Sequence, residues 1–338
     1  MFLEFFYIFV NIFCKIKYVI IYYILGGKAI LHDIFYRQYN RVELRSKSKH
    51  VAIVTGGARG IGSSIVKMLM ECDMHVVIGC INTENAKMMI KKLREQGVVK
   101  GEASVLELNL KSLKSVSKFA SLFNECHEYL NILVNNAGIM FMPYEETEDG
   151  FESQFAVNYL GHFLLTHLLL PRMFEASRRF TTSPRIVNVS SCAHEVSPII
   201  NFDDINMTNF YIEQAAYAQS KICLLMFSKA LDRRLKRAGS NIQVITVHPG
   251  IVNTELFNGT LVKLLAPWVL TIFGKTPEEG ATSVVFCCID DSTENAGGSY
   301  YSNCFPVKCT QYADDVKTQE KLYNFSNELI KKYCSNDI

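Results

Sequence analysis

The sequence has no strong excess of charge of either sign. Its 35 Lys and Arg residues nearly balance 33 Asp and Glu residues, which gives a formal net charge of +2. Proteins that bind nucleic acid usually carry a basic face, so this balance argues against a nucleic-acid partner. The 11 cysteines contain no CxxC pair and no other spacing typical of zinc ligands. We therefore expect reduced thiols that pack in the core, and no metal site.

Internal repeats and low-complexity linkers are also missing, which argues against solenoid and array architectures. The composition is that of a globular protein, with 49% hydrophobic and 20% charged residues. The chain is long enough for one large domain with a substantial core. We predict a single domain over residues 50–330.

The N-terminal segment lacks the small-residue cleavage site that ends a secretory signal peptide. Residues 2–14 and 18–25 are almost wholly apolar, and Lys15 and Lys17 lie between them. The whole run is about long enough to span a bilayer, but each lysine costs ~3 kcal/mol at the centre of a spanning helix. We expect residues 1–27 to form a membrane anchor that either spans at a tilt or lies at the interface. A helix buried in the protein is the alternative.

A basic linker is predicted over residues 28–49. It contains Lys28, Arg37, Arg41, Arg45, Lys47 and Lys49. Basic residues next to a membrane segment are typical of its cytosolic side. We therefore expect the domain that follows to face the cytosol.

Short apolar runs alternate with helical patterns after residue 50. The runs predict strands at 50–55, 75–80, 103–108, 131–135, 185–190 and 242–247, with helices at 61–71, 84–96, 113–127, 151–174 and 215–238. Such alternation is typical of βαβ units and a parallel sheet. The strands are rich in Val and Ile without polar alternation, which indicates burial on both faces. We predict an α/β fold, a Rossmann-type doubly wound parallel sheet with its cofactor site at the carboxyl ends of the strands.

A glycine-rich loop follows the first predicted strand and opens the first helix. Gly56, Gly60 and Gly62 are spaced Gly-x-x-x-Gly-x-Gly, with Ile61 between the last two. Glycines let the backbone turn tightly and approach a pyrophosphate, which then lies on the helix N-terminus. The strand–glycine–helix order therefore predicts a dinucleotide site rather than a plain turn.

The end of the second predicted strand carries no acidic residue. An acid there would bind the adenosine ribose hydroxyls and favour NAD, but residues 79–82 read Gly-Cys-Ile-Asn. Arg59, inside the glycine loop, has the charge to contact a 2′-phosphate instead. We predict NADP(H) as the favoured cofactor and NAD(H) as the alternative. Arg59 as a solvated loop charge is the competing interpretation.

Tyr217 and Lys221 lie four residues apart in a predicted helix. This spacing places them on the same face of the helix, about one turn apart. An ammonium near a phenol favours the phenolate, so we expect Lys221 to lower the pKa of Tyr217. A tyrosine tuned in this way can transfer protons near neutral pH. The pattern also occurs in many helices as an ordinary surface pair.

Together these motifs resemble the short-chain dehydrogenase/reductase family over residues from about 50 to 330. The resemblance rests on TGxxxGxG at 55–62, NNAG at 135–138, YxxxK at 217–221 and PGxxxT at 249–254. It implies a catalytic group of Tyr217, Lys221, Ser191 and Asn158. It also implies cofactor contacts from Gly56, Arg59, Gly60, Ile61, Gly62, Asn82, Asn109, Asn136, Ala137, Gly138, Tyr217, Lys221, Pro249, Gly250 and Thr254. Asn109 stands where the family often has an aspartate near the adenine.

The resemblance also implies a role for each catalytic residue. Tyr217 would exchange a proton with the substrate oxygen, and Ser191 would donate a hydrogen bond to that oxygen. Lys221 would lower the pKa of Tyr217 and hold the ribose hydroxyls. Asn158 would position a water that links Lys221 to solvent.

Longer stretches are similar to the retinol-dehydrogenase branch of the family. They are residues 158–166, the segment between Ser191 and Tyr217, and residues 275–281. Residues 216–221 and 249–254 are most similar to a member associated with polyprenol and dolichol metabolism at the endoplasmic reticulum. This similarity implies a lipid alcohol or aldehyde substrate and a location at that membrane. It is compatible with a homo-oligomer.

The segment 256–274 is expected to cover the active site, and its residues 261–273 are strongly apolar. It is either a lid that admits a long apolar alcohol or aldehyde, or a helix that packs on its own domain. A retinol/retinal enzyme and a small-carbonyl reductase of the same fold are alternative functions. A non-catalytic nucleotide-binding interaction protein is a third, against which the intact catalytic residues argue.

Overall fold

The computed structural model describes residues 2–334, with side chains from residue 10 onward. Its centre is one sheet with the strand order β3-β2-β1-β4-β5-β6-β7-β8. All neighbouring strands are parallel except β7 and β8, which are antiparallel. The strands are β1 (Val51–Thr55), β2 (His75–Cys80), β3 (Glu102–Glu107), β4 (Ile132–Asn135), β5 (Arg185–Val189), β6 (Gln243–His248), β7 (Tyr300–Ser302) and β8 (Phe305–Val307).

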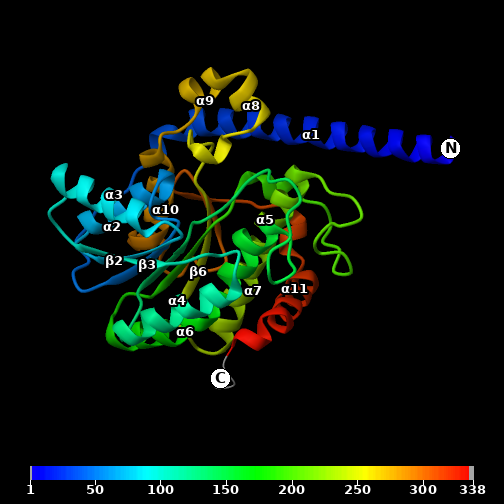
Figure 1. Ribbon diagram of the computed structural model, residues 1–338. Coiled ribbons are helices and arrows are strands. Elements are labelled where there is room, and N and C mark those ends of the chain that lie inside the picture. The colour runs from blue at the N-terminus through cyan, green and yellow to red at the C-terminus, as the bar shows by residue number, and fades with distance from the viewer. Residues whose placement is uncertain (1, 335–338) are drawn as a thin grey trace.

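Helices cover both faces of this sheet, as Figure 1 shows. One core packs the sheet against α4 (Leu113–Cys126), α6 (Gly161–Arg179), α7 (Glu213–Arg237) and α11 (Val316–Ile330). The other packs it against α2 (Gly60–Glu71), α3 (Thr83–Glu95) and α10 (Pro277–Ile289). The predicted doubly wound fold is confirmed. The strand order reverses between β1 and β4, and ligands of such sheets bind at the carboxyl edge beside that reversal.

The six predicted strands and the helices between them are all present, with ends shifted by a few residues. Burial on both faces was predicted for all the strands. This prediction is wrong for β3, which is only half-buried because it forms the edge of the sheet. β7, β8, α10 and α11 were not predicted. β7 and β8 have three residues each, too few to show a hydrophobic period.

The N-terminal helix α1 runs from Phe2 to Tyr36, past residue 27 and into the segment predicted as a linker. Within the described residues it is the one helix long and apolar enough to cross a membrane. Figure 1 shows it across the top of the domain beside α8 (Leu261–Leu265) and α9 (Pro267–Phe273), with its N-terminal part extending beyond the body. Hydrogen bonds from Tyr18 to Val196 and from Ile251 to Asp33 attach one face of α1 to the domain.

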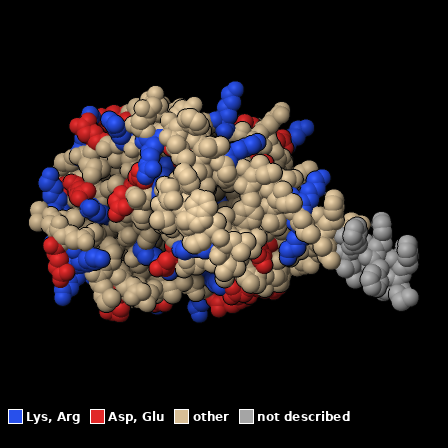
Figure 2. Space-filling view, turned by 90° about the horizontal axis from the view of Figure 1, so that it is seen from above, with Lys and Arg blue, Asp and Glu red and all other residues tan. Residues whose placement is uncertain are grey.

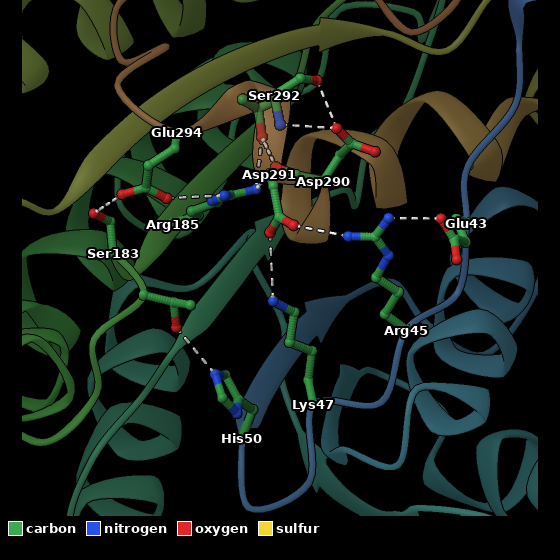
Figure 3. Close-up of polar contacts among 12 residues, drawn as sticks. Glu43, Arg45, Lys47, His50, Ser183, Arg185, Asp290, Asp291, Ser292 and Glu294 are labelled. Carbon is green, nitrogen blue, oxygen red and sulfur yellow. Dashed lines mark hydrogen bonds and ion pairs between the residues drawn. The ribbon is translucent and has the colours of Figure 1, made fainter.

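The segment between α1 and β1 is also fastened to the domain, which Figure 3 shows in detail. The Arg45 guanidinium donates to Asp291 at 2.9 Å, and Lys47 Nζ lies 3.9 Å from the same carboxylate. Nearby, buried Arg185 donates to the Thr293 hydroxyl at 2.6 Å. Arg45 and Lys47 of this segment thus pair with Asp291, just after α10.

Candidate active site

A cavity of about 1100 Å³ opens at the carboxyl edge of the sheet. It is lined by every residue that sequence analysis placed in the catalytic or cofactor site, with one exception. The exception is Asn158, which lies behind Gly138: a Cβ built on Gly138 would lie 3.2 Å from Asn158 Oδ1. The fold therefore brings segments from residue 56 to residue 254 to one place.

The glycine loop between β1 and α2 requires its glycines. Gly56 and Gly60 have φ of +66° and +56°, in the left-handed region that side chains disfavour. A Cβ on Gly62 would lie 2.2 Å from the Gly56 carbonyl oxygen, so no side chain fits. The loop thus exposes backbone at the N-terminus of α2, where a pyrophosphate is favoured.

The Asn-Asn-Ala-Gly segment after β4 holds this loop in place. The backbone amides of Asn136 and Ala137 donate to the Thr55 hydroxyl at 2.9 and 3.0 Å. The Asn136 side chain donates to the Thr55 carbonyl at 2.9 Å. These bonds fix the loop against the strand after the topological reversal, and so form a rigid floor for a dinucleotide.

The predicted adenosine end contains no carboxylate at the tip of β2. Asn82 accepts a hydrogen bond from Asn85 N at 2.9 Å and caps α3. Asn109 Oδ1 accepts from Lys111 N at 3.0 Å. Arg59 pairs with Glu255 across the cavity, and both side chains are mostly exposed. The Arg59 guanidinium is thus directed at Glu255 in this structure.

Tyr217 and Lys221 share one face of α7, as predicted, and both line the cavity while being almost fully buried. The Lys221 ammonium lies 5.6 Å from the centroid of the Tyr217 ring. It donates to the Val189 carbonyl at the end of β5, at 2.9 Å. Ser191 follows that strand, and its hydroxyl accepts from Ala193 N at 3.2 Å. Two adjacent elements therefore deliver the three groups to one point.

The predicted pKa shift of Tyr217 is wrong in this structure. Burial raises the pKa of Tyr217, and the hydrogen bond from Ser191 opposes that rise only in part. Lys221 does not lower it: its ammonium donates to the Val189 carbonyl and lies 5.6 Å from the centroid of the Tyr217 ring. Burial also lowers the pKa of Lys221 from 10.5 to about 8. The site therefore presents a protonated phenol beside a lysine whose pKa is about 8.

Asn158 lies in a π-helical turn, Ala156–Leu160, that leads into α6. Such turns occur often at functional sites. Its side chain accepts from Ile139 N and donates to Ile139 O, both at 2.9 Å, and it also donates to Ser220 Oγ at 2.9 Å. Asn158 thus joins the turn after Gly138 to α7, next to Lys221. Its predicted role in holding a water stays a prediction.

Sequence analysis favoured a membrane anchor for α1, with a helix buried in the protein as the alternative, and missed the part of α1 in the site. Tyr22, Gly26, Gly27 and Ile30 of α1 line the same cavity. The Tyr22 ring lies 5.2 Å from that of Phe141, which lies 5.9 Å from the Tyr217 ring, each pair edge to face. Two adjacent glycines inside an apolar helix were the signal that could have indicated this role.

The segment predicted to cover the site does so. Leu256, Phe257, Val262 and Leu270 line the cavity from the loop before α8 and from α8 and α9. On the outer side Leu264, Leu265 and Trp268 are 74%, 76% and 57% exposed. Figure 2 views the face that carries α1, α8 and α9, where uncharged side chains predominate between scattered charges. The roof of the cavity thus carries large apolar side chains on both its inner and its outer side.

His248 was not among the predicted site residues, yet it lines the cavity at the end of β6. Both of its ring nitrogens are buried and lack a hydrogen-bond partner within the described residues. Burial lowers the pKa of His248 to about 4, so the ring is neutral at physiological pH. It therefore presents a neutral imidazole next to Pro249 and Gly250.

Comparison with known proteins bears directly on this site. The family model described as short chain dehydrogenase matches residues 50–262. Polyprenol dehydrogenase of Homo sapiens is 38% identical over 284 residues, which cover 82% of this chain and 84% of that protein. Short-chain dehydrogenase TIC 32 A, chloroplastic, of Brassica napus is 38% identical over 84% of this chain and 90% of its own. Retinol dehydrogenase 11 of Homo sapiens is 35% identical over 83% and 85%.

Solved structures agree on the fold. An uncharacterized protein from Mycobacterium paratuberculosis superposes with a TM-score of 0.68 at 31% identity, covering 86% of this chain and 96% of that one. NADPH-bound carbonyl reductase from chicken fatty liver superposes with a TM-score of 0.58 at 22% identity, covering 79% and 100%. The second likeness concerns the fold alone.

Proposed function

The chain belongs to the short-chain dehydrogenase family, and on that premise we propose that it interconverts a long isoprenoid alcohol and its carbonyl at a membrane surface, with NADP(H) as the preferred cofactor. Family membership makes it an NAD(P)-dependent oxidoreductase of alcohols and carbonyls. Our proposal goes beyond family membership in three respects: the substrate class, the preference for NADP(H) and the location at a membrane. Polyprenol and dolichol are alcohols of the class we mean.

One observation carries the choice of an apolar substrate: the elements that roof the cavity over Tyr217 are also those that expose apolar side chains. Helices α1, α8 and α9 line the cavity on their inner sides. Their outer sides expose Ile16, Ile20, Ile24, Leu31, Phe35, Leu264, Leu265, Trp268 and Ile272. Large exposed apolar surface of this kind is typical of membrane contact. An apolar ligand could pass from lipid to Tyr217 without crossing water.

The attachment of α1 favours a helix that lies on the membrane over one that spans it. The Tyr18 hydroxyl donates to the Val196 carbonyl at 2.6 Å, so α1 is docked on the domain from there onward. The preceding helical residues, 2–17, extend about 24 Å at 1.5 Å per residue. That length falls short of the ~30 Å hydrocarbon core. We infer an interfacial arrangement at the endoplasmic reticulum, with the catalytic domain on the cytosolic side.

The residues present fit a bound dinucleotide, because the glycine loop offers bare backbone that a Cβ would obstruct. When bound, the nicotinamide cofactor supplies or accepts the hydride. Tyr217, a neutral phenol, gives its proton to the carbonyl oxygen during reduction. The Ser191 hydroxyl donates a hydrogen bond to the same oxygen and stabilises its developing charge. Lys221 returns a proton to the site, and Asn158 positions Lys221 through Ser220.

The preference for NADP(H) rests on what surrounds the end of β2. Among the described residues no carboxylate lines the cavity at that end for ribose hydroxyls, and Arg59 is the cation within the glycine loop. To meet a 2′-phosphate, Arg59 must leave Glu255. That pair is mostly exposed, and such pairs contribute only about 0–1 kcal/mol. A phosphate therefore competes well for the guanidinium, while NAD(H) remains the alternative cofactor.

Purified full-length protein in detergent tests the proposal. NADPH and NADH are each paired with a long polyprenal, with retinal and with a short aldehyde. Preferred turnover of the polyprenal supports the proposal, and preferred turnover of retinal supports the retinol-type alternative. Turnover of the short aldehyde alone removes the lipid substrate and leaves the catalytic group standing. Cofactor binding without any turnover supports the non-catalytic alternative.

A further inference from the structure

One face of α1 is directed toward the domain. Tyr18, Tyr22, Gly26, Ala29 and Asp33 recur at intervals of three and four residues, which places them on one side of a helix. Ala29 and Asp33 are buried, and Tyr22 packs on Phe141. Gly26 lies in the middle of this face and lines the cavity. The adjacent Gly27 is more exposed and also lines the cavity, so α1 has no side chain at two consecutive positions here.

The packing of the protein does not explain a glycine at this position. Gly26 is helical, with no positive φ that would require glycine. A Cβ built on it would meet no atom of the described residues within 4 Å. Glycine inside a helix lowers helix stability by about 1 kcal/mol relative to alanine. Gly27, the next residue, adds a second destabilisation of the same size. Gly62 of the cofactor loop is the contrasting case, since a Cβ there would collide with the Gly56 carbonyl.

The gap beside Gly26 is held open from both ends. On one side, two turns earlier, the Tyr18 hydroxyl donates to Val196 O at 2.6 Å. On the other, two turns later, Asp33 accepts from Ile251 N at 2.8 Å. These two contacts set the position of α1 over the domain on either side of Gly26. The space therefore remains part of the cavity, with Tyr22 and Ile30 one turn away on either side.

We propose that Gly26 determines which substrates fit, because its missing side chain leaves the passage for the apolar chain of the substrate beneath α1. The inference rests on the proposed function in taking that chain to be a long isoprenoid. The reacting oxygen lies at Tyr217, and the aromatic contacts from Tyr217 through Phe141 to Tyr22 lead from it to Gly26. A side chain at position 26 would narrow this path and leave the catalytic group untouched.

The test compares Gly26→Leu and Gly26→Ala with wild type, in full-length protein in detergent with NADPH. The substrates form a series of aldehydes from a short alkyl chain to long isoprenoids. Ile24→Phe is the control, because it adds bulk two positions away on the exposed side of α1. We expect Gly26→Leu to lower kcat/KM for the longest aldehydes by about 10-fold or more, and for the shortest by less than about 3-fold. The kcat/KM of Gly26→Ala for the longest aldehydes should lie between those of wild type and Gly26→Leu. The kcat/KM of Ile24→Phe should equal that of wild type for every aldehyde.

Several results would overturn the inference. An equal loss for every aldehyde would mean that position 26 affects the fold, and an equal loss with a raised KM for NADPH would place it against the cofactor. Unchanged kinetics for Gly26→Leu would mean that nothing passes there. If wild type accepts only short aldehydes, the isoprenoid proposal fails by itself. The role of Gly26 is then tested by the longest aldehyde that each protein turns over. If Gly26→Leu accepts the same longest aldehyde as wild type, the inference fails.

Discussion

Asp33 of α1 and Lys275, just before α10, form an ion pair at 3.4 Å with exposed fractions of only 3% and 2%. Both also bind the turn that follows β6. Asp33 accepts from Ile251 N at 2.8 Å, and Lys275 donates to the Pro249 carbonyl at 3.2 Å. The pair therefore joins the helix assigned to the membrane to the turn assigned to the cofactor. Helix α1 therefore contributes contacts that hold the predicted cofactor-binding turn in place.

Replacing Asp33 by asparagine should both destabilise the protein and weaken its cofactor site. The amide can still accept from Ile251, but Lys275 is left as a buried charge without its carboxylate. Breaking a buried pair in this way costs about 3–5 kcal/mol. Denaturant unfolding and the KM for NADPH measure the two effects. The double variant Asp33→Asn with Lys275→Met should recover much of the stability, and failure to do so would contradict the role of the charge pair.

Tyr217→Phe should lower kcat by about 10²–10⁴-fold, because the phenol is the proton donor. Cofactor affinity should change little, since the ring and its contact with Phe141 remain. Steady-state kinetics and a direct titration of NADPH binding separate these quantities. Tyr39→Phe is the matched control, because Tyr39 is exposed and lies outside the cavity. Undiminished turnover by Tyr217→Phe would disprove the assignment.

Carbonyl reduction should depend on pH through Lys221, whose pKa burial lowers to about 8. Below that value the side chain is an ammonium that can supply a proton, and above it the ammonium is lost. We therefore expect kcat/KM for reduction to fall as the pH rises through about 8. The residual activity of Lys221→Met should lack this step. The same step in both proteins would place the titrating group elsewhere.

The same shift makes a separate prediction for stability. Because the folded-state pKa of Lys221 is below its ordinary 10.5, the unfolded chain binds the additional proton between about pH 8 and 10.5. The contribution of Lys221 to the free energy of unfolding should therefore rise with pH across that window and be least favourable below it. Denaturant unfolding of wild type against Lys221→Met measures the difference.

Arg59→Gln should raise the KM for NADPH by about 10-fold or more and leave the KM for NADH nearly unchanged, since a hydrogen bond to a charged group contributes about 1.5–3 kcal/mol. Glu255→Gln is the informative partner, because it removes the carboxylate that holds Arg59. That variant should bind NADPH as well as wild type or better. Equal effects of Arg59→Gln on both cofactors would contradict the predicted phosphate contact.

Trp268→Glu should weaken binding to lipid vesicles, because it places a charge on the exposed apolar face of α9. Turnover of a short soluble aldehyde should stay close to wild type. Val99→Glu is the control, since Val99 is 82% exposed in the turn between α3 and β3, away from this face. Vesicle flotation measures binding. Unaltered flotation of the Trp268 variant would show that α9 does not touch the membrane.

Much of the catalytic domain could be predicted from local patterns. The glycine loop, the Asn-Asn-Ala-Gly segment and the Tyr217–Lys221 pair each combine residues a few positions apart, and the alternation of strands and helices orders them along one sheet edge. The short strands β7 and β8 escaped prediction because three residues show no period. The shift in the pKa of Tyr217 was predicted in the wrong direction. Sequence spacing shows which residue lies next to Tyr217 on the helix, but it does not show how deeply Tyr217 is buried.

The order of the elements, the residue types of the site and the apolar character of α1 can be predicted without the fold, because they follow from residues close together in the chain. The place of α1 over the cavity cannot be predicted in this way. That place depends on Asp33 meeting Ile251 and Lys275, and on Tyr22 meeting Phe141, across long separations in the chain. Hydropathy averaged along α1 marks the whole helix as apolar and cannot distinguish a face that contacts lipid from one that contacts substrate. Packing makes that distinction, because it buries one face and leaves the other exposed.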